Sequence, residues 1–225
     1  MTEPDTPKVP YHPRMAERFR GYLPVVIDVE TGGFNAATDA LLEIAAIPLR
    51  QDAAGYLHPA ETWCEQIAAF PGANLEPDSL AFTGIQPDNP LRGAIPEQLA
   101  LTQLFQMVRR AMKASGCKKA ILVGHNAFFD LSFIHAAVAR TRQKRNPFPP
   151  FSTLDTVTLA AACYGQTALA RATKMAGMTW DATQAHGALY DAEKTAALFC
   201  QMINHGVSIN NDNLQPNLSQ PKVAQ

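Results

Sequence analysis

The chain has 225 residues, of which 47% are hydrophobic and 17% charged, and its formal net charge at pH 7 is -1. This composition excludes an intrinsically disordered chain, and the length suits one α/β domain with a sizeable core. The N-terminus has no apolar signal segment and no apolar run is long enough to cross a bilayer, so we expect a cytoplasmic protein without membrane contact. Four widely spaced cysteines without a C-x-x-C pair argue against a zinc ribbon or a redox motif.

The first half of the chain is predicted to be mainly strands. Residues 22–30 are β-rich and end at a Thr-Gly-Gly turn, and 41–49 form a second apolar strand close enough to pair antiparallel with the first. A third strand is expected within 62–67. Residues 71–96 are rich in Pro, Gly and Asn, and we expect one short helix there, around 77–82.

The second half alternates helices with short strands. Apolar residues at helical spacing predict a helix over 97–115, which Gly116 ends. Strands before helices, and then alternation, predict an α/β fold with a mixed central sheet flanked by helices. We expect this domain to span 15–205, between a disordered arm (1–14) and a disordered polar tail (206–225). The remaining expected elements are strands at 120–124 and 152–155 and helices at 130–143, 156–163, 168–176 and 188–204.

The motif Asp28-Val-Glu30 ends the first predicted strand. Side chains two residues apart on a strand face the same side, so both carboxylates project together, and they repel unless a cation lies between them. An isolated D-x-E is most often the solvent-exposed end of a strand. The run Val25-Val-Ile27, however, predicts an interior strand, where an unpaired acid is costly. We therefore interpret the pair as part of a metal site at the carboxyl end of the strand.

A second motif, His125-Asn126-x-x-x-Asp130, lies where a predicted strand gives way to a helix. Taken alone, Asp130 would be interpreted as an N-cap, with His125 and Asn126 satisfying the backbone of the turn. Because Asp28 and Glu30 occur in the same chain, we favour a metal or phosphate role for this motif.

The third motif is His186-x-x-x-x-Asp191. Residues five apart on a continuous helix are about 140° out of phase, so we place His186 on a loop and Asp191 in the first turns of the last helix. The alternative is an exposed loop histidine and a helix-start aspartate, which are both common. A histidine that can move beside a metal site suits a general base. Four carboxylates and one histidine are the set that a two-metal phosphodiesterase needs.

Phenylalanines and basic clusters accompany these motifs. Phenyl rings on turns are poorly placed for a core and can stack on unpaired bases, for about 1–3 kcal/mol each, whereas Phe133 and Phe199 are expected in the core. The net charge does not indicate a nucleic-acid binder, but the carboxylates of a metal site would offset basic clusters, which are either solvated faces or phosphate contacts. The rings on turns are Phe34, Phe82, Phe128, Phe129 and Phe151, and the basic clusters are Arg14, Arg18 and Arg20; Arg109, Arg110, Lys113, Lys118 and Lys119; and Arg140, Arg142, Lys144 and Arg145.

The three motifs together resemble those of the DEDDh 3′→5′ exonucleases, which have the ribonuclease H-like fold, and those of the ribonuclease T branch in particular. The likeness covers roughly residues 14–205. The stretches that carry it are Phe19-Arg-Gly-Tyr, Pro24-Val-Val-Ile-Asp-Val-Glu-Thr, Gly33-Phe-Asn-Ala, Leu41-Leu-Glu-Ile-Ala-Ala-Ile, Ala81-Phe-Thr-Gly-Ile, Lys144-Arg-Asn-Pro-Phe and Gln184-Ala-His-Gly-Ala-Leu-Tyr-Asp.

The resemblance implies roles for particular residues. Two Mg²⁺ ions per subunit, replaceable by Mn²⁺, would be bound by Asp28, Glu30, Asp130 and Asp191, with His186 beside the metals as the general base. Stacking on the last bases of the 3′ strand would fall to Phe34, Phe82, Phe129 and Phe151, with Asp78 standing where related enzymes carry a longer glutamate that helps discriminate bases. The resemblance also implies a homodimer in which a basic patch of one subunit holds the RNA whose 3′ end enters the partner's site. The patch residues are Arg18, Arg20, Lys113, Lys119 and Lys144.

We therefore expect a Mg²⁺-dependent 3′→5′ exoribonuclease that trims short 3′ overhangs of tRNA and rRNA precursors and releases nucleoside 5′-monophosphates. It should also degrade single-stranded DNA. The alternatives are a DNA proofreading or repair exonuclease and a non-catalytic RNA-binding module on the same fold. The loop-rich segment 71–96 with its extra phenylalanine argues against the first, and the presence of all five motif residues argues against the second.

Overall fold

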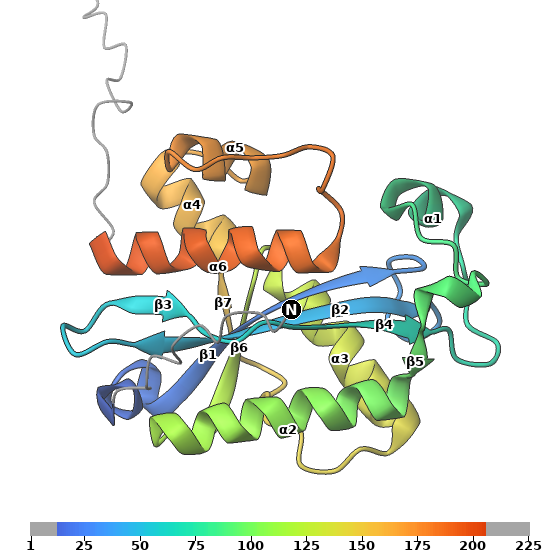
Figure 1. The fold of residues 1–225 in the computed structure, drawn as a ribbon, viewed down its shortest axis with the longest axis horizontal. Coiled ribbons are helices and arrows are strands. Elements are labelled where there is room, and N and C mark those ends of the chain that lie inside the picture. Colours follow the sequence, from blue (N-terminus) through green and yellow to red (C-terminus); the bar gives the residue numbers. More distant parts are fainter. Residues whose placement is uncertain (1–12, 206–225) are drawn as a thin grey trace, which may run out of the picture.

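A seven-stranded mixed sheet forms the middle layer of the molecule (Figure 1). The computed structural model describes residues 13–205, and its strands lie in the order β5-β4-β2-β1-β6-β7, with β3 beside β2. All five predicted strands are confirmed, whereas the sequence pattern does not predict the short strands β3 and β5. The strands are β1 (Tyr22–Thr31), β2 (Leu41–Gln51), β3 (Leu57–Pro59), β4 (Trp63–Ala68), β5 (Ile95–Pro96), β6 (Lys119–Gly124) and β7 (Thr153–Asp155).

Strand β1 lies in the centre of the sheet, between β2 and β6. β2 is antiparallel to β1, as the short connection predicts, and β6 and β7 continue the sheet in the parallel direction. Val25, Val26 and Ile27 are at most 1% exposed, which confirms the expected interior strand. Because parallel strands end at the same edge, the carboxyl ends of β1, β6 and β7 lie together, where open α/β sheets keep their sites.

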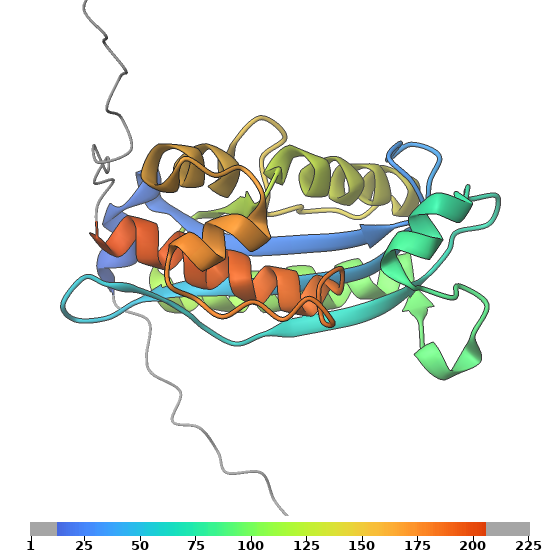
Figure 2. The ribbon, with the colours of Figure 1, turned by 90° about the horizontal axis from the view of Figure 1, so that it is seen from above.

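Helices cover both faces of this sheet. α2 and α6 lie on opposite faces (Figure 1), and α6 runs lengthwise along the strands when the molecule is seen from above (Figure 2). α3 packs against α2, and α4 and α5 pack against α6. The helices are α1 (Pro77–Thr83), α2 (Glu97–Ser115), α3 (Ala127–Thr141), α4 (Thr156–Tyr164), α5 (Leu169–Met175) and α6 (Ala188–His205), with short 3₁₀ helices at Pro13–Glu17, Phe19–Gly21 and Pro90–Arg92.

The spacing of apolar residues predicts the bounds of α2 correctly but places the start of α3 too late in the chain. α2 has the predicted bounds, because Leu101, Leu104 and Phe105 are buried on one face and Gly116 ends the helix with a φ of 70°. α3 begins at Ala127, three residues before the predicted start at 130. The interpretation of Asp130 as an N-cap is therefore wrong, since that residue lies inside the first turn.

The predicted arm (1–14) and tail (206–225) lie outside the described residues, apart from the start of the first 3₁₀ helix at Pro13. Phe133 and Phe199 are fully buried, as expected for core residues. Within residues 13–205, we find no helix with the length and apolar character needed to cross a membrane.

Candidate active site

Three carboxylates gather at the carboxyl end of β1. Asp28 and Glu30 come from this strand, and Asp191 comes from the first turn of α6. Each offers one oxygen, and the three oxygens lie within 4.8 Å of one another. The fold thus brings residues more than 160 positions apart in the chain into one acidic cluster. Their places at the end of the first strand and in the first turn of the last helix are those predicted from the first and third motifs.

Burial and mutual repulsion make these acids difficult to ionise. Burial, followed by the charge of Asp130, raises the pKa of Asp28 well above its usual value. Burial, followed by the charges of Asp191 and Glu43, raises the pKa of Glu30 to about 8. Burial also raises the pKa of Asp191. A bound cation would remove this repulsion, because it attracts the charged form of every acid in the cluster.

The cluster fits a divalent cation. Carboxylate oxygens are the ligands that Mg²⁺ and Mn²⁺ prefer. In addition, the buried Asp191 Oδ1 accepts no hydrogen bond from any described residue. Buried carboxylate oxygens are normally paired, so an unpaired one that belongs to an acidic cluster is available to a metal ion.

Asp130 is a fourth carboxylate, and it is hydrogen-bonded to the backbone of β1 between Asp28 and Glu30. It is only 4% exposed, and its Oδ1 accepts a hydrogen bond from the backbone N–H of Val29, between the two β1 acids, at 3.0 Å. Gly124 leaves room for this carboxylate, since a Cβ there would lie 3.0 Å from Asp130 Oδ2 and 2.9 Å from the Cα of Ala127. Asp130 contributes none of the three clustered oxygens, but its charge acts on both Asp28 and Glu30.

The turn that carries Asp130 is held by a carboxylate that sequence patterns do not single out. Asp155, at the end of β7, accepts hydrogen bonds from the backbone N–H of Ala127 at 3.0 Å and of Val157 at 2.8 Å. It therefore caps α3 and α4 together. The available signal was its place at the carboxyl end of a predicted strand.

A second carboxylate missed by sequence patterns is Glu43 on β2. Antiparallel pairing places it directly opposite Glu30. It is the one charged residue in the otherwise apolar stretch Leu41–Leu49, and that isolation was the signal available in the sequence.

The two motif histidines differ in their surroundings. His125 is held at both ring nitrogens, by Thr156 Oγ1 at 2.9 Å and by the Thr167 carbonyl at 2.8 Å. His186 is exposed on the loop before α6, with a φ of 66°, and its backbone N–H donates to Asp191 Oδ2 at 3.4 Å. Its ring packs against Phe82 in a tilted arrangement, with 3.9 Å between ring centroids and 45° between the ring planes. His186 is therefore exposed to solvent, as predicted for a loop histidine, whereas His125 also lines the cavity over the cluster but has both ring nitrogens engaged by protein groups.

A cavity of about 520 Å³ opens over the acidic cluster. Besides the three carboxylates and His186, its lining includes Phe34, Phe82, Phe129 and Asp78. Phe34 is 87% exposed and Phe82 64% exposed, although burial of such rings is the rule. Phe151 is also exposed but does not belong to this lining, so the structure brings three of the four predicted stacking rings to the cluster.

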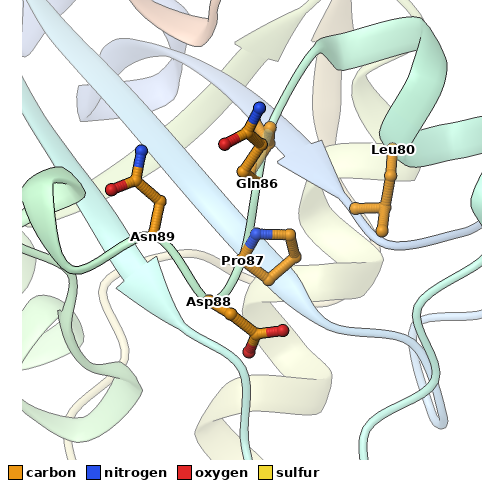
Figure 3. A pocket seen from close by; sticks show the side chains of 6 residues that line it. Leu80, Gln86, Pro87, Asp88 and Asn89 are labelled. Atoms are coloured by element: carbon orange, nitrogen blue, oxygen red, sulfur yellow. The ribbon is translucent and has the colours of Figure 1, made fainter.

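A second hollow, of about 640 Å³, lies between α1 and the following loop (Figure 3). Leu80, Pro87 and Asp88 line it together with Ile85, Gln86 and Asn89, and Asp88 is the one ionisable group among them. This hollow lacks the acid cluster and the histidine that phosphodiester chemistry requires, so the smaller cavity over Asp28 is the candidate active site.

The basic residues predicted to bind RNA lie away from this cavity. Lys119 begins β6 and pairs with Tyr22 at the start of β1. Glu30 lies eight residues further along β1, or about 26 Å at roughly 3.3 Å per residue. Arg18 and Arg20 precede β1 at the same end, with Lys113 in the last turn of α2, and Lys144 follows α3.

Comparison with known proteins identifies the family. A family model described as an exonuclease, RNase_T, matches residues 25–199. A ribonuclease T from Actinobacillus pleuropneumoniae (serotype 5b, strain L20) is 57% identical over 190 residues, which cover 84% of this chain and 87% of the relative. The chain belongs to the ribonuclease T family of exonucleases.

Solved exonuclease structures share its fold. The nuclease domain of 3′hExo, a DEDDh family member bound to rAMP, matches with a TM-score of 0.64 over 84% of this chain and 94% of that chain, at 20% identity. E. coli exonuclease I in complex with a dT13 oligonucleotide matches with a TM-score of 0.62 over 86% of this chain, at 18% identity, and this chain spans 42% of it. These likenesses confirm the predicted ribonuclease H-like α/β fold, with its mixed sheet flanked by helices.

Proposed function

We propose that this 3′→5′ exoribonuclease trims short 3′ overhangs of structured RNA, such as tRNA ends and rRNA precursors, and releases nucleoside 5′-monophosphates. The observation that carries the proposal is the acidic cluster beneath exposed phenyl rings in one cavity. No described residue that lines the cavity reads the 2′-hydroxyl unambiguously, so we expect single-stranded DNA to be degraded as well. We also propose that the protein acts in the cytoplasm.

Divalent metal ions complete the site in this proposal. Asp28, Glu30 and Asp191 would hold Mg²⁺, with Asp130 joining them for a second ion, and Mn²⁺ would substitute. A bound metal ion would neutralise the negative charge that develops at phosphorus and would lower the pKa of the attacking water. The unpaired Asp191 Oδ1 and the raised pKa values of the cluster support this assignment.

His186 acts as the general base. Its ring is exposed at the cavity and lies on a loop, so it can accept a proton from the attacking water and release it to solvent. Its backbone bond to Asp191 keeps this loop beside the cluster. His125 cannot take the same role without losing the hydrogen bond at the ring nitrogen that would accept the proton.

Phenyl rings position the unpaired 3′ end. Phe34, Phe82 and Phe129 offer ring faces or edges to the last bases, and Asp78 stands at the cavity, where its carboxylate can accept a hydrogen bond from the exocyclic amine of a base. Phe151 would contact RNA outside the cavity. This arrangement recognises any unstacked base and therefore favours short single-stranded ends over duplex.

A homodimer would give the basic residues a role. Tyr22, the strand partner of Lys119, is about 26 Å from Glu30 of the same subunit on the strand spacing given above, and Arg18 and Arg20 precede Tyr22. A two- or three-nucleotide overhang would therefore not extend from the acidic cluster to this basic end. In a dimer, this basic end would hold the body of the RNA whose 3′ end enters the partner's cavity, and Lys113 and Lys144 would extend the patch.

The test is digestion of a homogeneous tRNA with and without Mg²⁺, read at single-nucleotide resolution. We expect stepwise loss of the 3′ nucleotides, 5′-monophosphate products and arrest at the duplex stem. Faster cleavage of mismatched duplex DNA than of tRNA would favour a repair exonuclease. Absence of Mg²⁺ and Mn²⁺ binding in calorimetry would favour a non-catalytic RNA-binding module instead.

A further inference from the structure

Glu43 lies beside the acidic cluster in a position that pairing geometry makes unfavourable. It stands directly opposite Glu30 across the antiparallel β1–β2 pair. Directly opposed side chains share a face of the sheet, with about 5 Å between their Cβ atoms, and like charges in such a pair destabilise the sheet. The charge of Glu43 also acts on Asp28, which lies two residues from Glu30 on the same face of β1. Glu43 is thus a further carboxylate that acts on the cluster.

Glu43 has a hydrogen-bond donor among the described residues but no close ion pair. The thiol of Cys64 on β4 donates a hydrogen bond to Glu43 Oε1 at 3.3 Å. Arg92 donates instead to Gln66 Oε1 and to the Leu42 carbonyl, although its guanidinium charge interacts with Glu43 from beyond contact distance. Among residues 15–205, no Lys, Arg or His nitrogen lies within 4 Å of the Glu43 carboxylate. A half-buried carboxylate without a direct ion pair is costly, and a cation in the neighbouring acidic cluster would offset that cost.

We propose that Glu43 is a positioning residue of the metal site, whose negative charge beside Glu30 and Asp28 strengthens divalent-cation binding without supplying a direct ligand. This rests on the metal site of the proposed function. The charge that costs stability in the metal-free protein becomes favourable when a cation enters the cluster, because attraction to the cation replaces repulsion among the acids. Glu43 therefore contributes with opposite signs to the two states.

This change of sign separates the proposal from a merely structural role. If Glu43 only accepted the Cys64 thiol, Glu43→Gln would lower the Tm equally with and without metal. If its charge acts on the cluster, Glu43→Gln raises the Tm in EDTA and weakens Mn²⁺ binding about tenfold, as loss of a group behind a metal ligand typically does. Glu43→Asp keeps the charge and should keep most of the affinity.

Glu65→Gln is the matched control. Glu65 lies on the neighbouring strand β4 and pairs with Ile44, so its side chain is on the other face of the sheet from Glu43. This variant removes one carboxylate from the same sheet, and we expect its Mn²⁺ affinity to stay within twofold of that of the unaltered protein.

The experiment is calorimetric titration of the full-length, EDTA-stripped protein and its variants with Mn²⁺, together with melting curves in EDTA and in Mn²⁺. A tenfold weaker affinity and a higher Tm in EDTA for Glu43→Gln support the proposal. An affinity within twofold of that of the unaltered protein, or a lower Tm in EDTA, overturns it. If the unaltered protein binds neither Mn²⁺ nor Mg²⁺, the metal site of the proposed function fails as well, so the two failures are distinguishable.

Discussion

The two ends of β1 differ in the sign of their charge and in their contact with water. At the carboxyl end, Asp28 and Glu30 are crowded with other acids and largely removed from solvent. At the amino end, Arg20 and Lys119 are exposed, as is Lys113 nearby. Buried charges act strongly on one another, whereas exposed charges are screened by water and salt. Single substitutions should therefore have large effects at the acidic end and small, additive effects at the basic end.

Among the substitutions considered, Asp28→Asn at the acidic end should reduce activity most. Loss of one negative ligand removes several kcal/mol of charge stabilisation at phosphorus, so nucleotide release should fall by more than about 10⁴-fold. The fold should persist, and the metal-free Tm should rise because a repelled, buried acid is gone. Single-turnover assays and melting curves measure both effects, and near-normal activity would contradict the metal site.

His186→Ala should separate proton transfer from metal binding at the same end. A general base contributes roughly 10²–10⁴-fold, so nucleotide release should fall by about 10³-fold. The Mn²⁺ affinity should remain within twofold, because the three clustered oxygens come from other residues. Activity that stays within about fivefold of the original would rule out His186 as the base.

Metal-free stability should depend on pH through the acidic end. Folded Glu30 keeps a proton up to a pKa of about 8, whereas the unfolded chain releases it near 4.5. Between these values the folded state binds more protons, so stability falls as pH rises. We expect the Tm in EDTA to decrease by roughly 5 °C or more from pH 5 to pH 8. In Glu30→Gln this decrease should become smaller, and an unchanged slope would contradict the assignment.

Lys113→Ala should produce the smallest effect, at the basic end. A lysine that contacts phosphate lowers the salt slope of binding by about 1 when removed, and the affinity for tRNA should fall a few-fold at moderate salt. Cleavage of a dinucleotide should stay unchanged, because so short a substrate cannot reach the basic end. Equal losses on tRNA and on the dinucleotide would show that Lys113 acts through the fold.

Local sequence patterns predicted the parts of the fold whose causes are local. The bounds of α2 follow from apolar spacing and from Gly116, and the interior position of β1 follows from Val25-Val-Ile27. The acidic cluster could be anticipated because the carboxyl ends of strands meet at one edge, although the catalytic roles of its residues remain predictions.

The errors have long-range causes. The start of α3 at Ala127 depends on Asp155, which is 28 residues away in the chain and supplies the cap through space. Glu43 could not be associated with Glu30 before the β1–β2 register was known. Phe151 lies outside the cavity that the other three predicted stacking rings line, which no local pattern indicates, and its stacking on RNA stays a prediction. Pairing register and distant caps are tertiary facts that a local pattern does not contain.

The shared cap at Asp155 has a consequence for local unfolding. One carboxylate caps the first turns of both α3 and α4, with Oδ2 on Ala127 and Oδ1 on Val157, so a rotation of the Asp155 side chain would release both helix starts together. The amide protons of Ala127 and Val157 should therefore exchange with deuterium at similar rates and with a common opening free energy. Asp130, in the first turn of α3, and helix α4, which packs against α6, would then belong to one cooperative unfolding unit.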